Sequence, residues 1–302
     1  MSWDLQQGGD IQRIIWRIKY HSQPYEHKEG TRHGYYHGGG ALDEVCAFVS
    51  LFTRQYVAAG GQVRQDDQPI RLPPRNGQGP IRCRSIAEGV VNLSDALQPF
   101  ALLDRIPEKN DQRLISAARN YQRALRNMDL DGEMAYLNFI TAIELFSQEH
   151  KIKVAYEELE NPYKKIFSYI EDESIRDKLV QKLSHLSKKF VSYMLHMLDE
   201  PFWSQSTSVS WNKLPQEEAS QYFKNLYDAR SELLHSGTPL PPGTVELTAQ
   251  PTDFANRLGI QAGDRRWQAK HMVPHISFLE RATHYILMRQ IGMLAESKVP
   301  GQ

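Results

Sequence analysis

Residues 222–237 read Tyr-Phe-Lys-Asn-Leu-Tyr-Asp-Ala-Arg-Ser-Glu-Leu-Leu-His-Ser-Gly. Apolar side chains recur in this stretch at intervals of three and four residues, which predicts an amphipathic helix. The apolar stripe consists of Phe223, Leu226, Tyr227, Leu233 and Leu234. Gly237 can adopt the left-handed conformation that caps a helix, and Pro239 cannot continue one. The helix is therefore expected to end here, with His235 in its last turn.

Arg230 lies within this apolar stripe, four residues after Leu226. A guanidinium on a buried face is costly unless a carboxylate pairs with it. Glu144 occupies a comparable position in an earlier predicted helix, because it follows Ile140 by four residues and Leu137 by seven. We therefore hypothesise an ion pair between Glu144 and Arg230 that joins two helices and directs the guanidinium. The alternative is that Glu144 lies on a solvated flank of its helix.

Arg230 and His235 are separated by four residues and combine a permanently charged donor with a titratable imidazole. Cleavage of RNA by its own 2′-hydroxyl needs a group that moves a proton and a donor that stabilises charge on the phosphorane. Neither role requires a metal. The simpler interpretation is a surface arginine and a histidine that complements the negative end of the helix dipole.

The composition excludes several classes of protein. Among 302 residues, 36 Lys and Arg balance 36 Asp and Glu, so the chain does not coat nucleic acid through its net charge. Cys46 and Cys83 are the only cysteines, which excludes a zinc ribbon and a disulfide scaffold. No apolar run reaches the ~18 residues of a membrane-spanning helix, and the amino terminus lacks the pattern of a secretory signal. We expect a cytoplasmic protein without a membrane partner.

The pattern of the chain changes near residue 106. Before it, alternating apolar and polar residues around Ile14 and Trp16 predict a strand, and helical spacing begins at Ala41. After it, the pattern is helical apart from the connecting loops. The predicted fold class is mainly α, with a smaller α+β module of unknown role in residues 1–105 and an all-helical bundle in residues 106–302.

Two of these segments resemble a known family. Residues 226–237, with the spacing Arg230-x4-His235, resemble the Arg-x4–6-His signature of the HEPN family and are most similar to its Apea-like branch. Residues 135–146 resemble the second helix of that branch, an apolar run with an embedded glutamate. The resemblance extends over roughly residues 112–296.

The resemblance implies a HEPN-like helical bundle that acts as a metal-independent endoribonuclease without cofactors, as a toxin or antiviral-defence effector. It implies a homodimer with a composite active site, an RNA substrate, and products with 2′,3′-cyclic phosphate and 5′-hydroxyl ends. Arg230 and His235 match the catalytic positions. Asp228, Ser231 and Glu232 are predicted to support them, although many HEPN nucleases have Asn, Asp or His where Ser231 stands.

Control of such a protein could come from an antitoxin or a sensor protein. Gly237 occupies the position of the tyrosine in the His-x-Tyr motif of some HEPN toxins, so we do not predict control by a nucleotidyltransferase that modifies this tyrosine. The rival hypothesis is a non-catalytic HEPN-like dimeric module that binds RNA, nucleotide or a partner protein.

The first module offers a second hypothesis for RNA contact. Basic and aromatic side chains that could grip and stack a single strand are interleaved there. They are Lys28, Arg32, Tyr35 and Tyr36. Four histidines lie among them, but their spacing matches no zinc motif, and a flexible glycine-rich loop is the simpler interpretation. These histidines are His21, His27, His33 and His37.

Overall fold

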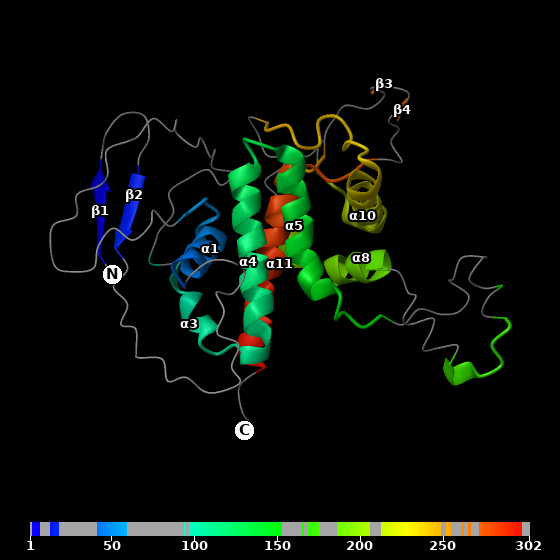
Figure 1. The fold of residues 1–302 in the computed structure, drawn as a ribbon, viewed down its shortest axis with the longest axis horizontal. Coiled ribbons are helices and arrows are strands. Elements are labelled where there is room, and N and C mark those ends of the chain that lie inside the picture. Colours follow the sequence, from blue (N-terminus) through cyan, green and yellow to red (C-terminus); the bar gives the residue numbers. More distant parts are fainter. Residues whose placement is uncertain are drawn as a thin grey trace. The chain divides into compact units, whose positions relative to one another are not determined.

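The computed structural model describes most of the helical part of the chain and short pieces elsewhere. The described residues are 2–6, 13–17, 41–58, 94, 97–152, 165, 168–175, 186–205, 213–248, 252–254, 261–262, 265–266 and 272–297. This part of the protein is mainly helical, as the sequence predicted (Figure 1). None of its helices is sufficiently long and apolar to span a membrane.

The chain divides into two compact units. The first comprises residues 1–40 and 60–82, and the second comprises residues 41–59 and 83–302. In the first unit, β1 (Ser2–Gln6) pairs antiparallel with β2 (Arg13–Arg17), which contains the predicted strand residues Ile14 and Trp16.

The second unit contains the longer helices. They are α1 (Ala41–Thr53), α4 (Glu108–Asn127), α5 (Gly132–Ser147), α8 (Leu186–Met197), α10 (Ala219–Ser236) and α11 (Ile276–Glu296). Shorter elements are α3 (Phe100–Leu103), α9 (Glu200–Ser204), the 3-10 helix η4 (Gln216–Glu218) and the strands β3 (Gln261–Ala262) and β4 (Arg265–Arg266).

Two features of this unit differ from the expected organisation. Helix α1 was assigned to the module of residues 1–105, but it packs against α4 and belongs to the helical unit. Residues 106–302 were expected to be all-helical, yet β3 and β4 form a short antiparallel pair. Two residues, Gly263 and Asp264, separate these strands in the sequence, a spacing typical of a hairpin, but they lie in a stretch that was predicted to be a loop.

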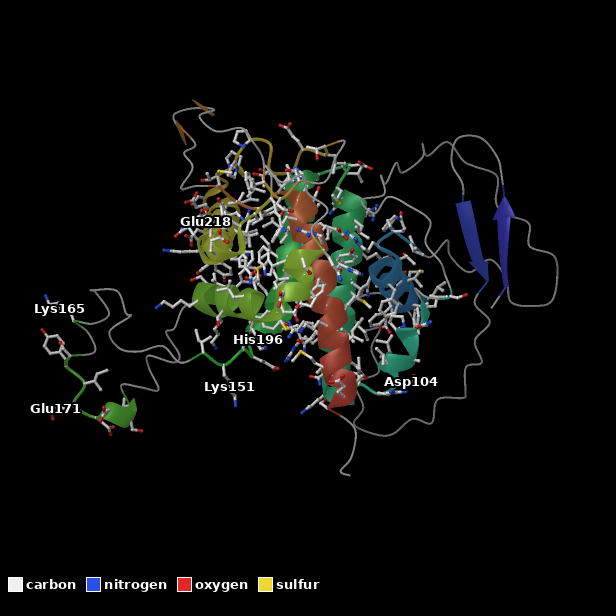
Figure 2. The ribbon with its side chains drawn as sticks, turned by 180° about the vertical axis from the view of Figure 1, so that it is seen from behind. Asp104, Lys151, Lys165, Glu171, His196 and Glu218 are labelled. Carbon is white, nitrogen blue, oxygen red and sulfur yellow. The ribbon has the colours of Figure 1, made fainter. Side chains whose placement is uncertain are left out.

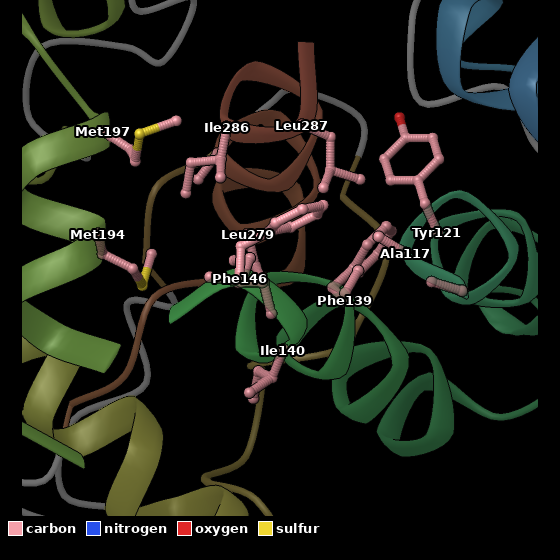
Figure 3. Packing of buried hydrophobic residues seen from close by; sticks show 14 of the residues in the cluster. Ala117, Tyr121, Phe139, Ile140, Phe146, Met194, Met197, Leu279, Ile286 and Leu287 are labelled. Atoms are coloured by element: carbon pink, nitrogen blue, oxygen red, sulfur yellow. The ribbon is translucent and has the colours of Figure 1, made fainter. Parts of the chain in front are cut away.

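The core of this unit forms where α4, α5 and α11 run side by side (Figure 1). Tyr121 and Phe139 meet edge to face with ring centroids 5.6 Å apart. Ala117 of α4, Phe139 of α5 and Leu279 of α11 all belong to this buried cluster (Figure 3). Each fully buried large apolar side chain contributes about 1.5–3 kcal/mol of stability, so this cluster fixes the helices that position the candidate site.

Helix α5 begins at a tightly packed point. The Asp131 side chain caps it by accepting a hydrogen bond from the Met134 backbone N–H at 3.0 Å. Glu133 accepts another from the backbone N–H of Leu240 at 2.9 Å, and a Cβ on Gly132 would lie 2.7 Å from a Val245 carbon. The segment that follows α10 is therefore held against the start of α5.

Helix α10 ends as the sequence predicted. Gly237 adopts a left-handed conformation with φ 64°, and its backbone N–H bonds to the Glu232 carbonyl. His235 lies in the last turn. Both α8 and α5 lie close to this region, because α10 packs on α8 and α8 packs on α5.

Candidate functional site

The ion pair hypothesised from the sequence is present. Arg230 Nη2 on α10 lies 2.9 Å from Glu144 Oε2 on α5 and donates a hydrogen bond to it. The side chains are only 21% and 13% exposed. The alternative of a solvated Glu144 is therefore excluded, and the apolar spacing of both helices accounts for the partly buried positions of the two charges.

Tyr227 joins the same pair. It precedes Arg230 by three residues and so lies on the same side of α10. Its ring centroid is 5.7 Å from the central guanidinium carbon, and its hydroxyl lies beside the Glu144 carboxylate. Burial, together with the nearby Glu144 carboxylate, raises the pKa of Tyr227 to about 12, so the hydroxyl keeps its proton at neutral pH.

One donor of Arg230 has no acceptor. Its Nε is buried and has no hydrogen-bond partner among the described residues. Such a donor costs about 1–3 kcal/mol or more. Arg281 Nη1 is in the same situation, and the Arg281 guanidinium likewise pairs with a carboxylate, Asp253, and lies near an aromatic ring, 4.6 Å from the Phe202 centroid. Arg230 thus retains hydrogen-bonding capacity suited to an anionic oxygen.

His235 occupies a different face of α10. At 3.6 residues per turn, positions 230 and 235 are separated by about 140° around the helix and about 7.5 Å along it. The His235 side chain is exposed, whereas Arg230 is directed to Glu144. Within a single copy of α10, these two side chains therefore leave the helix in diverging directions.

The predicted supporting residues lie on the side of His235. Asp228, Glu232 and His235 follow one another at intervals of four and three residues, and Ser231 lies beside them. Burial raises the pKa of Asp228, Lys224 lowers it and Glu232 raises it further. The structure thus groups these residues along one face and does not bring them to the Arg230–Glu144 pair. Figure 2 labels two residues near this region: Glu218, which lies just before α10, and His196, which lies near the end of α8.

The other predicted sites cannot be placed. Lys28, Arg32, Tyr35 and Tyr36 lie outside the described residues, as do the four histidines near them. In the part of the chain that the structure describes, no three His, Cys, Asp or Glu side chains are arranged to hold a metal ion. Cys46 is buried, and burial together with Asp43 raises the pKa of its thiol to about 11.

Tyr227 was not predicted as a site residue, because its spacing is that of a core residue in the apolar stripe. A usable signal was present, since an aromatic residue three positions before a buried arginine can contact the guanidinium. A second buried polar cluster, in which Arg54 and Tyr121 both contact Glu280 on α11, was not predicted either.

Comparison of the chain with protein-family models, curated proteins and solved structures finds no match. Function is therefore inferred from the chemistry of α5, α8 and α10.

Proposed function

We propose that this chain is a metal-independent endoribonuclease of the HEPN type. The helical unit, residues 41–59 and 83–302, supplies the HEPN-like bundle. The observation that carries this proposal is the Arg230–Glu144 pair, which holds a guanidinium with a free donor on the same helix that exposes His235. A cytoplasmic toxin or antiviral-defence effector, restrained by an antitoxin or a sensor protein, fits this activity.

The reaction needs only groups that the chain possesses. The ribose 2′-hydroxyl attacks the adjacent phosphorus and the bond to the 5′-oxygen breaks, which leaves a 2′,3′-cyclic phosphate and a 5′-hydroxyl. His235 accepts the proton of the 2′-hydroxyl or donates one to the leaving oxygen. Arg230 stabilises the extra negative charge of the phosphorane through its free donors. Glu144 orients Arg230 and does not contact the substrate.

The divergence of Arg230 and His235 around α10 supports a composite site. A scissile phosphate bound to Arg230 of one copy is best reached by His235 of a second copy, so the active form is a homodimer. Asp228, Ser231 and Glu232 share the His235 face and orient the imidazole in that arrangement.

Cleavage of a mixed RNA pool in EDTA, with analysis of the product ends, tests this function. We expect cyclic-phosphate ends from the wild type and a loss of about 100- to 1000-fold in Arg230→Ala, the range for removing one oxyanion donor. His235→Ala is expected to be equally inactive. Two matched controls should cleave normally: His196→Ala, an exposed histidine in the last turn of α8, and Arg113→Ala, whose Glu149 partner is exposed.

Three outcomes would contradict the proposal. They are cleavage that needs a divalent metal, cleavage that survives in both site variants, and no cleavage by a folded dimeric wild type. The last outcome, combined with retained RNA binding, would favour a non-catalytic dimeric module that binds RNA, nucleotide or a partner protein. Expression in cells gives a second readout, because a nuclease should arrest growth and His235→Ala should not.

A further inference from the structure

The Arg230 guanidinium is fixed at only one corner by hydrogen bonding. Among the described residues, Nη2 donates to Glu144 and Nε has no acceptor. A planar group held at one corner can still turn about that contact, so a single ion pair does not define the direction of the remaining donors. A second contact is required to fix the plane.

Tyr227 supplies contacts to both members of the ion pair. Its ring lies 5.7 Å from the guanidinium carbon of Arg230, within the range of a cation–π contact. Its hydroxyl lies beside the Glu144 carboxylate, and burial together with that charge raises the pKa of the tyrosine. The three side chains therefore form one cluster, in which Tyr227 lies against both charged groups.

Helix α8 holds the tyrosine in place. The Phe190 ring lies 5.2 Å from the Tyr227 ring at an interplanar angle of 47°, and Phe190 is fully buried in the core. Rotation of the Tyr227 ring away from Arg230 would therefore disturb packed apolar side chains. Through this contact, α8 takes part in the site.

We propose that Tyr227 is a positioning residue for Arg230, which it orients with its ring while its hydroxyl holds the Glu144 carboxylate. The catalytic consequence rests on the proposed function, whereas the positioning itself is a property of the folded protein. Removing only the hydroxyl should free Glu144 to rotate and should loosen the guanidinium while the apolar packing stays intact.

Hydrogen exchange at Arg230 Nε tests the positioning without reference to cleavage. The Nε–H signal in a proton–nitrogen NMR spectrum is assigned by its disappearance in Arg230→Lys. We expect exchange with water to become at least tenfold faster in Tyr227→Phe. Phe190→Leu, which releases the ring from α8, should accelerate exchange as well.

Tyr222→Phe is the matched control on the same helix. The Tyr222 hydroxyl also bonds to a glutamate, Glu218, at 3.1 Å, and its ring also stacks on a phenylalanine, Phe254, with centroids 6.3 Å apart. This variant should leave the Arg230 exchange rate unchanged. Unchanged exchange in a folded Tyr227→Phe, or equal acceleration in Tyr222→Phe, would overturn the proposal.

Cleavage kinetics then test the catalytic consequence. We expect Tyr227→Phe to lower kcat about tenfold with KM within about twofold, because orientation of the donor is lost while binding surface is kept. In a Glu144→Gln background, the same substitution should cost less than about twofold, since it acts through Glu144. Independent, multiplicative losses would overturn this route of action. If the wild type does not cleave RNA, the proposed function fails, and the exchange experiment still decides the positioning.

Discussion

Two arginine–glutamate–tyrosine clusters in the helical unit use the same residue types in different ways. At the end of α1, Arg54 donates from Nε and Nη2 to the two carboxylate oxygens of Glu280, and Tyr121 donates to the same carboxylate. On α10, Arg230 donates from Nη2 alone to Glu144, and its buried Nε has no partner among the described residues.

The difference separates a structural cluster from a candidate site. The Glu280 side chain is completely buried and accepts three hydrogen bonds. The Arg54 and Tyr121 groups that donate these bonds are therefore not available to bind a ligand. The cluster also holds Arg54 at φ 55°, a left-handed conformation that costs about 1–3 kcal/mol for a residue with a side chain. Incomplete satisfaction therefore distinguishes the Arg230 cluster from the Glu280 cluster, a feature that Arg281 shares through its Nη1 among the described residues.

The largest expected effect on stability comes from breaking the Glu280 cluster. Glu280→Ala removes three hydrogen bonds and leaves Arg54 without its carboxylate, which should lower the free energy of unfolding by about 3–5 kcal/mol. Glu144→Ala removes one hydrogen bond to a charged group and should cost about 1.5–3 kcal/mol. Urea denaturation of both variants measures the difference.

The control for these two variants is Glu149→Ala, which breaks the exposed pair with Arg113 and should cost less than about 1 kcal/mol. Equal costs for Glu280→Ala and Glu144→Ala would contradict the distinction between the two clusters.

The Glu280 cluster should also give the protein a pH-dependent stability through His284. Burial, with a smaller contribution from Arg54, lowers the pKa of His284 to about 4, while Glu280 opposes the shift. An unfolded histidine titrates near 6.5, so between pH 6.5 and 4 the unfolded chain binds more protons than the folded one. Stability should therefore be complete above pH 6.5 and should fall by up to about 3 kcal/mol as the pH drops to 4.

Urea denaturation at several pH values checks the pH effect, and His284→Gln should flatten this part of the profile. His150 and His275 also have lowered pKa values, so some dependence should persist in the variant. A profile identical to that of the wild type would show that His284 does not contribute.

A smaller effect than that of Glu280→Ala is expected at the anchor of the segment that follows His235. Gly132→Ala places a Cβ 2.7 Å from a side-chain carbon of Val245 and 3.2 Å from its carbonyl oxygen. This overpacking should cost about 1–2 kcal/mol, less than the Glu280 change. Gly292→Ala on α11 meets nothing within 4 Å and should instead stabilise by up to about 1 kcal/mol. Thermal unfolding of the two variants compares them directly, and stabilisation by Gly132→Ala would show that the Val245 segment is not firmly held.

The local sequence pattern was sufficient to predict α10 and to predict that Arg230 needs a carboxylate partner. Helical spacing placed Arg230 on a buried face, and the same spacing identified Glu144 as a partner on an earlier helix. The pattern could not show that Tyr227 contacts both, because its apolar spacing is equally typical of a core residue. It also could not show that Arg54 pairs with Glu280, since these residues are 226 positions apart.

The sequence by itself determined the helical class of the chain, the capped end of α10 and the unusual placement of a charge in an apolar stripe. These features depend on the periodicity of the helix and on the conformational limits of Gly and Pro, which act over a few residues. The tertiary structure decided that α1 packs with the bundle, that Tyr227 lies against the Arg230–Glu144 pair, and that Arg230 Nε finds no acceptor among the described residues. Those outcomes depend on the relative placement of whole helices, which is set by the packing of distant side chains.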